Sequence, residues 1–237
     1  RALQSLHIAQ DVSHCNEGHA AFLGLERIRN LVLRRRLTFA EALEVVRSSS
    51  LFTTHTPVPA GHDAFPEAMV RQYLSHYPGE LGIDWAQFIG LGRVDPEDPN
   101  EKFSMSVLAC NLSQEVNGVS WLHGEVSKEI LGNLWPGYFK NELHIGYVTN
   151  GVHFPTWTAM RLRRLYARYF PEGFEGHEYR ISEWKKVYDI PDEDLWRERL
   201  VLKEKLVRMI RRRYCDPGHV RMDSPHQVMQ VLEGIRP

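Results

Sequence analysis

The chain has 237 residues, 43% hydrophobic and 25% charged, which is typical of a globular protein, and its 29 basic and 30 acidic residues predict no nucleic-acid partner. No apolar run approaches the roughly 20 residues that span a bilayer, so no membrane segment is expected. The 3 cysteines are too widely spaced for a disulfide framework or a CxxC metal pair, and we expect a reduced, cytoplasmic setting.

The first predicted strand covers residues 8–15, and the polar turn 16–19 ends it. We expect three of its side chains to be buried: Ile8, Val12 and Cys15. A helix follows to about residue 35, because apolar residues recur at helical spacing. These residues are Ala21, Leu25, Ile28 and Val32.

The second predicted strand, residues 51–54, lies between two predicted helices, at 38–47 and 66–77. A short buried strand between helices is the unit of a parallel α/β sheet. Prolines 57 and 59 prevent the strand from continuing. His55 and Thr56 therefore lie just past its carboxyl end, where open α/β sheets bind ligands.

Further helices are predicted at 84–91, 103–115 and 119–131, and Asn117-Gly118 is interpreted as the C-cap of the second of these. Residues 144–149 predict a third strand, which ends at Asn150-Gly151.

Beyond residue 151 the predicted elements are nearly all helical. They cover residues 157–170, 182–188 and 191–214, and a last helix starts at Pro225. We therefore expect residues 1–150 to form a partial α/β catalytic lobe and residues 151–237 a mostly helical segment. The chain opens inside a predicted helix and closes directly after another, so we expect neighbouring sequence on both sides.

Each of the three predicted strands ends in a polar cluster: residues 16–19, 55–56 and 149–151. Right-handed crossovers bring the carboxyl ends of parallel strands to one edge. The clusters supply a carboxylate, imidazoles, hydroxyls and amides, a set that suits the hydroxyl groups of a sugar. Gly18 and Gly151 would let the backbone approach a ligand closely.

Each cluster taken alone has an ordinary structural interpretation. His19 could stabilise the start of a helix, His55 could be a satisfied buried histidine, and Asn150-Gly151 could be a turn. Their position at the same end of three successive strands favours a binding site. The 12 histidines lack the HExxH spacing, so no metal site is predicted. Phosphate-binding glycine loops and the GxSxG elbow are also missing from the sequence.

Four segments resemble motifs of the α-glucan (glycogen, starch, maltodextrin) phosphorylases, in that family's order. They are Asn16-Glu17-Gly18-His19, Thr53-Thr54-His55-Thr56, residues 113–119 with His123, and residues 149–152 with Trp157. The sequence of residues 14–19 and of residues 56–62 is closer to the bacterial and archaeal branch than to the animal enzymes. Glu17, Gly18, Gln114 and residues 153–155 depart from the family's pattern and leave acceptor preference and regulation open.

The resemblance implies part of a Rossmann-like lobe of a two-lobed GT-B glycosyltransferase. It implies reversible phosphorolysis of α-1,4-glucan to glucose 1-phosphate, with retention at the anomeric carbon. The family's cofactor is pyridoxal phosphate, whose lysine belongs to the other lobe. We find no matching segment here, so we expect this chain alone neither to hold the cofactor nor to turn over. Homo-oligomer formation stays open.

By motif match, His55 is the catalytic residue: its ring would bind the sugar's 6-hydroxyl and its main-chain carbonyl would face the anomeric carbon. Asn150 would hold the same hydroxyl. The other substrate-binding residues of this prediction are Glu17, His19, Thr56, Asn117 and Gly151.

Two alternatives remain. A nucleotide-sugar glucan synthase also has an Asp-Val-x-His strand end, which residues 11–14 match, and a Phe-Thr-x-His strand, which residues 52–55 match. A non-catalytic glucan-binding module would bind oligosaccharide without chemistry.

Overall fold

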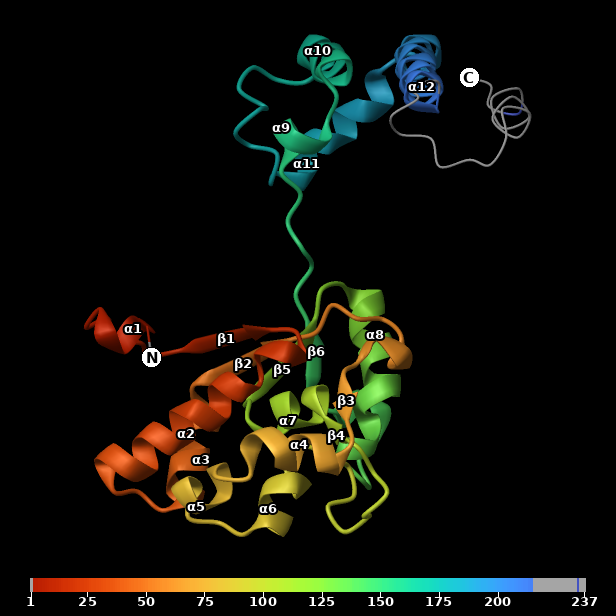
Figure 1. The fold of residues 1–237 in the computed structure, drawn as a ribbon. Helices are drawn as coiled ribbons and strands as arrows, with labels where there is room; N and C mark the ends of the chain where they lie inside the picture. Colours follow the sequence, from red (N-terminus) through yellow and green to blue (C-terminus); the bar gives the residue numbers. More distant parts are fainter. Residues whose placement is uncertain (1, 215–233, 235–237) are drawn as a thin grey trace. The chain divides into compact units, whose positions relative to one another are not determined.

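The structure, a computed structural model, describes residues 2–214 and residue 234. The chain divides into two compact units, Arg1–Asn150 and Gly151–Pro237, each of which is described by itself (Figure 1). The helix predicted from Pro225 lies outside the described residues.

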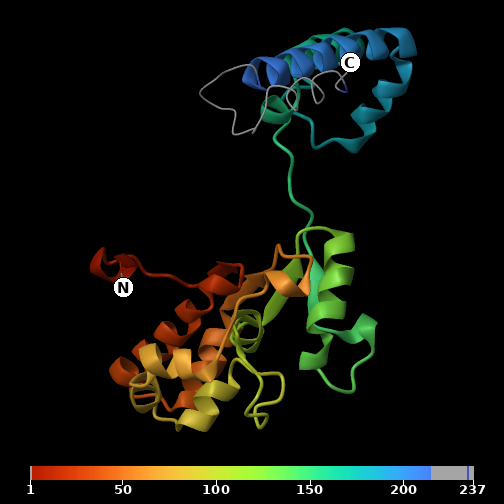
Figure 2. The ribbon, with the colours of Figure 1, turned by 45° about the vertical axis from the view of Figure 1, so that its right-hand side comes forward.

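The first unit is built on a four-stranded parallel sheet with the order β1-β2-β5-β6. The strands are β1 (Ser13–Asn16), β2 (Ser50–Thr53), β5 (Glu115–Gly118) and β6 (Ile145–Tyr147). Helices flank this sheet in both views (Figures 1 and 2). The predicted α/β class with parallel strands is therefore confirmed.

One face of the sheet is the core face. Cys15, Phe52, Val116 and Ile145 lie side by side in the parallel register, and all four are buried. Neighbouring residues in a strand point to opposite faces. The polar residues Asn16, Thr53 and Asn117 therefore form a row on the other face, close to the carboxyl ends of the strands, and Gly146 continues the row in β6.

Two helices connect β1 to β2: α2 (Phe22–Arg35) and α3 (Phe39–Ser48). Leu25 and Ile28 bury the core side of α2, as their spacing predicted. Thr38 caps α3: its side chain accepts a hydrogen bond from the Glu41 main-chain N–H, and the Glu41 side chain accepts one from the Thr38 N–H. The predicted capping box is confirmed.

Several short elements connect β2 to β5. They are β3 (Ala64–Phe65), α4 (Glu67–Leu74), α5 (Tyr77–Leu81), α6 (Trp85–Gly90), β4 (Phe103–Ser104) and α7 (Met105–Asn111). Helix α8 (Trp121–Leu131) then connects β5 to β6.

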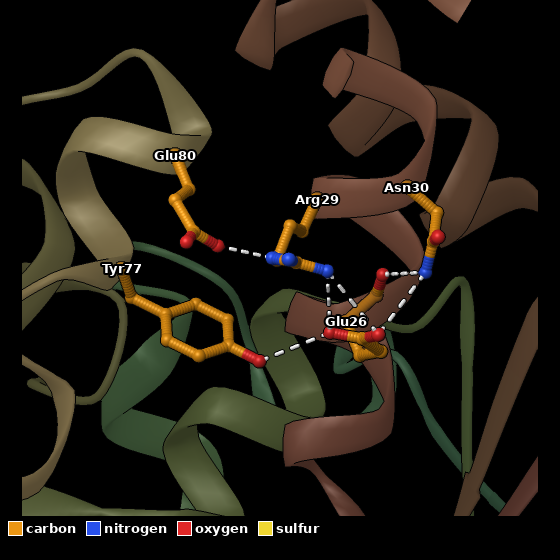
Figure 3. Close-up of polar contacts among 5 residues, drawn as sticks. All are labelled: Glu26, Arg29, Asn30, Tyr77 and Glu80. Atoms are coloured by element: carbon orange, nitrogen blue, oxygen red, sulfur yellow. Dashed lines mark hydrogen bonds and ion pairs between the residues drawn. The ribbon is translucent and has the colours of Figure 1, made fainter. Parts of the chain in front are cut away.

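A polar cluster joins α2 to α5 (Figure 3). The Tyr77 hydroxyl donates a 3.1 Å hydrogen bond to the Glu26 carboxylate, and Arg29 forms ion pairs with both Glu26 and Glu80. The Asn30 amide donates to the main-chain carbonyl of Glu26 at 2.7 Å. These contacts fix the orientation of α5 against the second and third turns of α2.

The helix predicted over residues 103–115 is confirmed only over residues 105–111, and residues 103–104 form β4. The helix ends at Asn111, and Asn117-Gly118 is part of β5 rather than a C-cap. The apolar sequence of α7 is also typical of a longer buried helix. Val116, however, lies in a strand, where it pairs with Phe52 of β2 on one side and with Ile145 of β6 on the other. Pairing with two neighbouring strands outweighs local propensity here.

The first strand is shorter than predicted. Pairing with β2 begins only at Ser13, so Ile8 and Val12 are exposed, and only Cys15 of the three expected core residues is buried.

The second unit is helical in the described residues. It contains α9 (Phe154–Trp157), α10 (Met160–Tyr169), α11 (Ile181–Trp184) and α12 (Asp192–Tyr214). Its core is aromatic: the Phe174 and Trp184 rings meet edge to face at 5.0 Å. Within residues 2–214, no helix is both long and apolar enough to cross a membrane.

Candidate active site

The carboxyl ends of the four strands lie along one edge of the sheet, joined by main-chain hydrogen bonds beyond the strands themselves. Glu17 N–H donates to the Thr53 carbonyl at 2.8 Å, and Thr54 N–H donates to the Asn117 carbonyl at 3.0 Å. Asn150 N–H donates to the Val119 carbonyl at 3.1 Å. The polar strand ends are therefore neighbours, as the sequence predicted, with β5 as an additional member between β2 and β6.

Glu17 holds the first residues after β2. One carboxylate oxygen accepts a short hydrogen bond from the main-chain N–H of His55. The other accepts a 2.6 Å hydrogen bond from the Thr56 hydroxyl. Three predicted site residues therefore meet directly, and the carboxylate joins the ends of β1 and β2.

The environment of Glu17 favours its charged form. Partial burial alone would raise the pKa of this carboxyl, but the hydrogen bonds from Thr56 and from the His55 N–H outweigh it and lower the pKa. Glu17 is therefore an ionised acceptor near neutral pH.

The His55 ring is oriented by Asn16, the last residue of β1. Its Nε2 atom lies 3.2 Å from Asn16 Oδ1. Because a carbonyl oxygen only accepts, Nε2 carries the proton, and in the neutral imidazole Nδ1 then presents a lone pair. His55 is exposed, so this lone pair is accessible to a ligand hydroxyl.

Asn117 is buried and engaged by its neighbours. Its Oδ1 atom accepts a 2.8 Å hydrogen bond from the Thr53 hydroxyl, and its Nδ2 donates to the Gly118 carbonyl at 3.0 Å. His14 Nε2 lies 2.7 Å from the same Thr53 hydroxyl. The predicted site residue Asn117 thus lies behind the edge, within a chain of hydrogen bonds that crosses three strands.

The remaining predicted residues are exposed, and their side chains are not hydrogen-bonded to the Glu17 cluster in the described part of the chain. His19 is exposed in the short 3-10 helix η1 (Gly18–Ala20), and Asn150 is exposed after β6. Among the described residues, no hydrogen bond joins either side chain to His55. Gly151 follows Asn150 as the first residue of the second unit and is exposed.

His62 and Ser106, which the sequence analysis did not assign to the site, support this edge of the sheet. His62 Nδ1 lies 2.6 Å from the Ser106 hydroxyl of α7, and a Cβ atom on Gly18 would lie 3.0 Å from that same oxygen. Gly18 is buried and packs closely against α7, so its backbone is not free to approach a ligand. The sequence held a signal for His62, which ends the same Pro-rich loop that begins at Thr56.

The described lysines do not fit a cofactor bound as an imine, which needs a lysine that faces an enclosed site. Within residues 2–214 no lysine is buried. Lys128 and Lys140 pair with Glu125, and Lys186 pairs with Asp189.

Comparison with known proteins finds relatives over most of the chain. No protein-family model matches it. It is 42% identical over 216 residues to a glycogen phosphorylase of Mycobacterium tuberculosis, which covers 86% of this chain. The chain is a relative of the bacterial and archaeal α-glucan phosphorylases. The chain is also 39% identical to a maltodextrin phosphorylase of Thermococcus litoralis, over 90% of its length. It is 41% identical to a glycogen phosphorylase of Aquifex aeolicus, over 89% of its length.

The relationship to α-glucan phosphorylases predicted from the four motifs is confirmed. The chain spans only 24% to 30% of the length of these curated relatives. A parallel sheet with flanking helices, followed by a helical unit, is consistent with part of one GT-B lobe.

Proposed function

We propose that the chain contributes the glucan-binding edge of a retaining α-1,4-glucan phosphorylase, which converts glycogen, starch or maltodextrin and phosphate reversibly to glucose 1-phosphate. The observation that carries this proposal is the cluster of Glu17, His55 and Thr56 at the carboxyl edge of a parallel sheet. The identity to known phosphorylases over most of the chain supports it.

The hydrogen-bond directions in the cluster fit a sugar. The Thr56 hydroxyl gives its proton to Glu17, so its oxygen is left to accept from a sugar hydroxyl. The Nδ1 lone pair of His55 can accept from a second hydroxyl, because Asn16 engages the other ring nitrogen. Both groups then act as acceptors for the ligand.

His55 also supplies the group closest to the chemistry. Its N–H donates to Glu17, and the hydroxyl of the next residue, Thr56, donates to the same carboxylate, so Glu17 holds the chain on both sides of the His55 carbonyl. The His55 carbonyl is proposed to face the anomeric carbon, where a fixed dipole stabilises the positive charge of an oxocarbenium-like transition state. Asn150, His19 and Gly151 are proposed to complete the sugar contacts, and Asn117 to support the edge from behind.

Pyridoxal phosphate is the proposed cofactor of the whole enzyme, held by residues other than those described here. No step is assigned to it in this chain. We also propose a cytoplasmic location. The 237 residues alone are expected to show neither Schiff-base absorbance nor release of glucose 1-phosphate.

The test is a product assay on the full-length natural protein that carries these residues. With maltoheptaose and phosphate, it should release glucose 1-phosphate. Transfer from ADP-glucose without phosphorolysis would instead identify a glucan synthase. Binding of maltoheptaose with neither reaction would identify a non-catalytic glucan-binding module.

A further inference from the structure

Glu17 has a backbone conformation that side chains other than glycine rarely adopt. Its φ is 65° and its ψ is 159°, a region populated almost entirely by glycine and costly for other residues. The neighbouring residue is a glycine, yet Glu17 is the one with positive φ. Such strain persists only where surrounding contacts hold the residue in place.

Three of the hydrogen bonds that hold Glu17 come from residues 53–56, at the end of β2 and just after it. Its N–H binds the Thr53 carbonyl, and its two carboxylate oxygens bind the His55 N–H and the Thr56 hydroxyl. The strained backbone is what lets the main chain and the side chain of Glu17 reach the same segment.

The other end of the following loop is tied to the same turn. His62 binds Ser106, which packs against the buried Gly18. A Cβ atom on Gly61 would lie 2.6 Å from Thr56 Cγ2, so the loop folds back on its own start. The loop of residues 56–62 is therefore held at both ends near Glu17 and Gly18. Thr56 bonds to Glu17 directly, and His62 bonds to Ser106, which packs against Gly18.

Both carboxylate oxygens of Glu17 already accept hydrogen bonds from the protein. We propose that Glu17 is a positioning residue: it holds the His55 peptide and the Thr56 hydroxyl in place, and its effect on sugar binding is exerted through them. The effect on sugar binding rests on the proposed function, whereas the positioning of His55 and Thr56 by Glu17 does not.

The structural test uses amide exchange of the 237-residue chain, with the His55 N–H as the reporter. In wild type this amide should exchange slowly and resonate far downfield, because it donates to a carboxylate. Glu17→Ala should speed its exchange at least tenfold. Glu17→Gln, which keeps one acceptor, should be intermediate. Glu115→Ala removes an exposed carboxylate at the opposite end of the same sheet and should leave the signal unchanged.

A double-mutant cycle separates positioning from direct sugar contact. Thr56→Val removes the hydroxyl that Glu17 holds. If Glu17 acts through Thr56 and His55, the double variant Glu17→Ala/Thr56→Val should bind maltoheptaose no more than about twofold more weakly than Glu17→Ala alone. Fully additive losses would overturn the proposal, and so would an unchanged His55 amide in Glu17→Ala. A protected His55 amide in the 237-residue chain, together with no maltoheptaose binding by the full-length natural protein, would count against the proposed function and still support the positioning role.

Discussion

The Thr53 hydroxyl donates a 2.8 Å hydrogen bond to Asn117 Oδ1 and so joins β2 to β5 inside the protein. A hydroxyl has one proton, so the 2.7 Å contact between Thr53 and His14 must use an N–H of the histidine. The direction of the whole chain of hydrogen bonds, from β1 to the Gly118 carbonyl, is therefore fixed.

Thr53→Val should destabilise the first unit by about 1–3 kcal/mol, because it leaves the buried Asn117 oxygen without a donor. Urea denaturation of the chain measures this change. Thr149→Val, at an exposed position near the same edge, is the matched control and should change stability by less than about 0.5 kcal/mol. Equal stabilities of the two variants would contradict a stabilising role for the buried hydrogen bond from Thr53 to Asn117.

Glu67 should make the stability of the first unit depend on acid pH. Hydrogen bonds from Arg71, then Trp85 and Arg93, lower the pKa of its carboxyl to about 2. Because the folded pKa is depressed, the stabilisation is complete above the ordinary glutamate pKa of about 4.3 and is lost as the pH falls from there towards about 2. Glu67→Gln should flatten the stability profile in this window.

At neutral pH the same substitution should cost about 1.5–3 kcal/mol, since the buried Arg93 loses its charged partner. Glu44→Gln removes one partner of the exposed Glu44–Arg47 pair and should cost well under 1 kcal/mol. A steep acid transition that persists unchanged in Glu67→Gln would show that other carboxylates dominate.

The strain at Glu17 predicts an unusual order of stability. Glu17→Ala and Glu17→Gly both remove the carboxylate, but only glycine adopts the observed φ of 65° without strain. The glycine variant should therefore be more stable than the alanine variant by about 1 kcal/mol in chemical denaturation. An alanine variant as stable as the glycine variant would mean that the backbone at this position is relaxed.

Gly118→Ala should displace the start of α8. The added Cβ would lie 2.7 Å from His123 Nδ1 and 2.8 Å from the main-chain nitrogen of Gly124. We expect a loss of about 1–3 kcal/mol, as in other overpacked cores. Gly79→Ala, where a Cβ atom meets nothing within 4 Å, is the control and should be neutral or stabilising. The same effect from both substitutions would contradict the close packing at Gly118.

Local signals in the sequence were sufficient for several elements. Thr38 and Glu41 marked the start of α3, and the spacing of Leu25 and Ile28 marked the buried side of α2. The polar residues after Thr53 and Asn16 also identified the edge where the strand ends meet.

Other features depend on contacts between distant residues. β5 is a strand because Val116 lies between Phe52 and Ile145, and nothing local distinguishes it from the end of a helix. The positive φ of Glu17 follows from three hydrogen bonds to residues 53–56, which are remote in sequence. The tie between His62 and Ser106 likewise spans 44 positions.

The most direct measurement of the central claim is the rate of glucose 1-phosphate release by the full-length natural protein with His55→Ala. If His55 contacts the sugar at the reacting centre, kcat should fall by roughly 10²–10³-fold while the fold, checked by circular dichroism, is kept. Turnover equal to that of wild type would contradict the assignment of this strand edge as the active site.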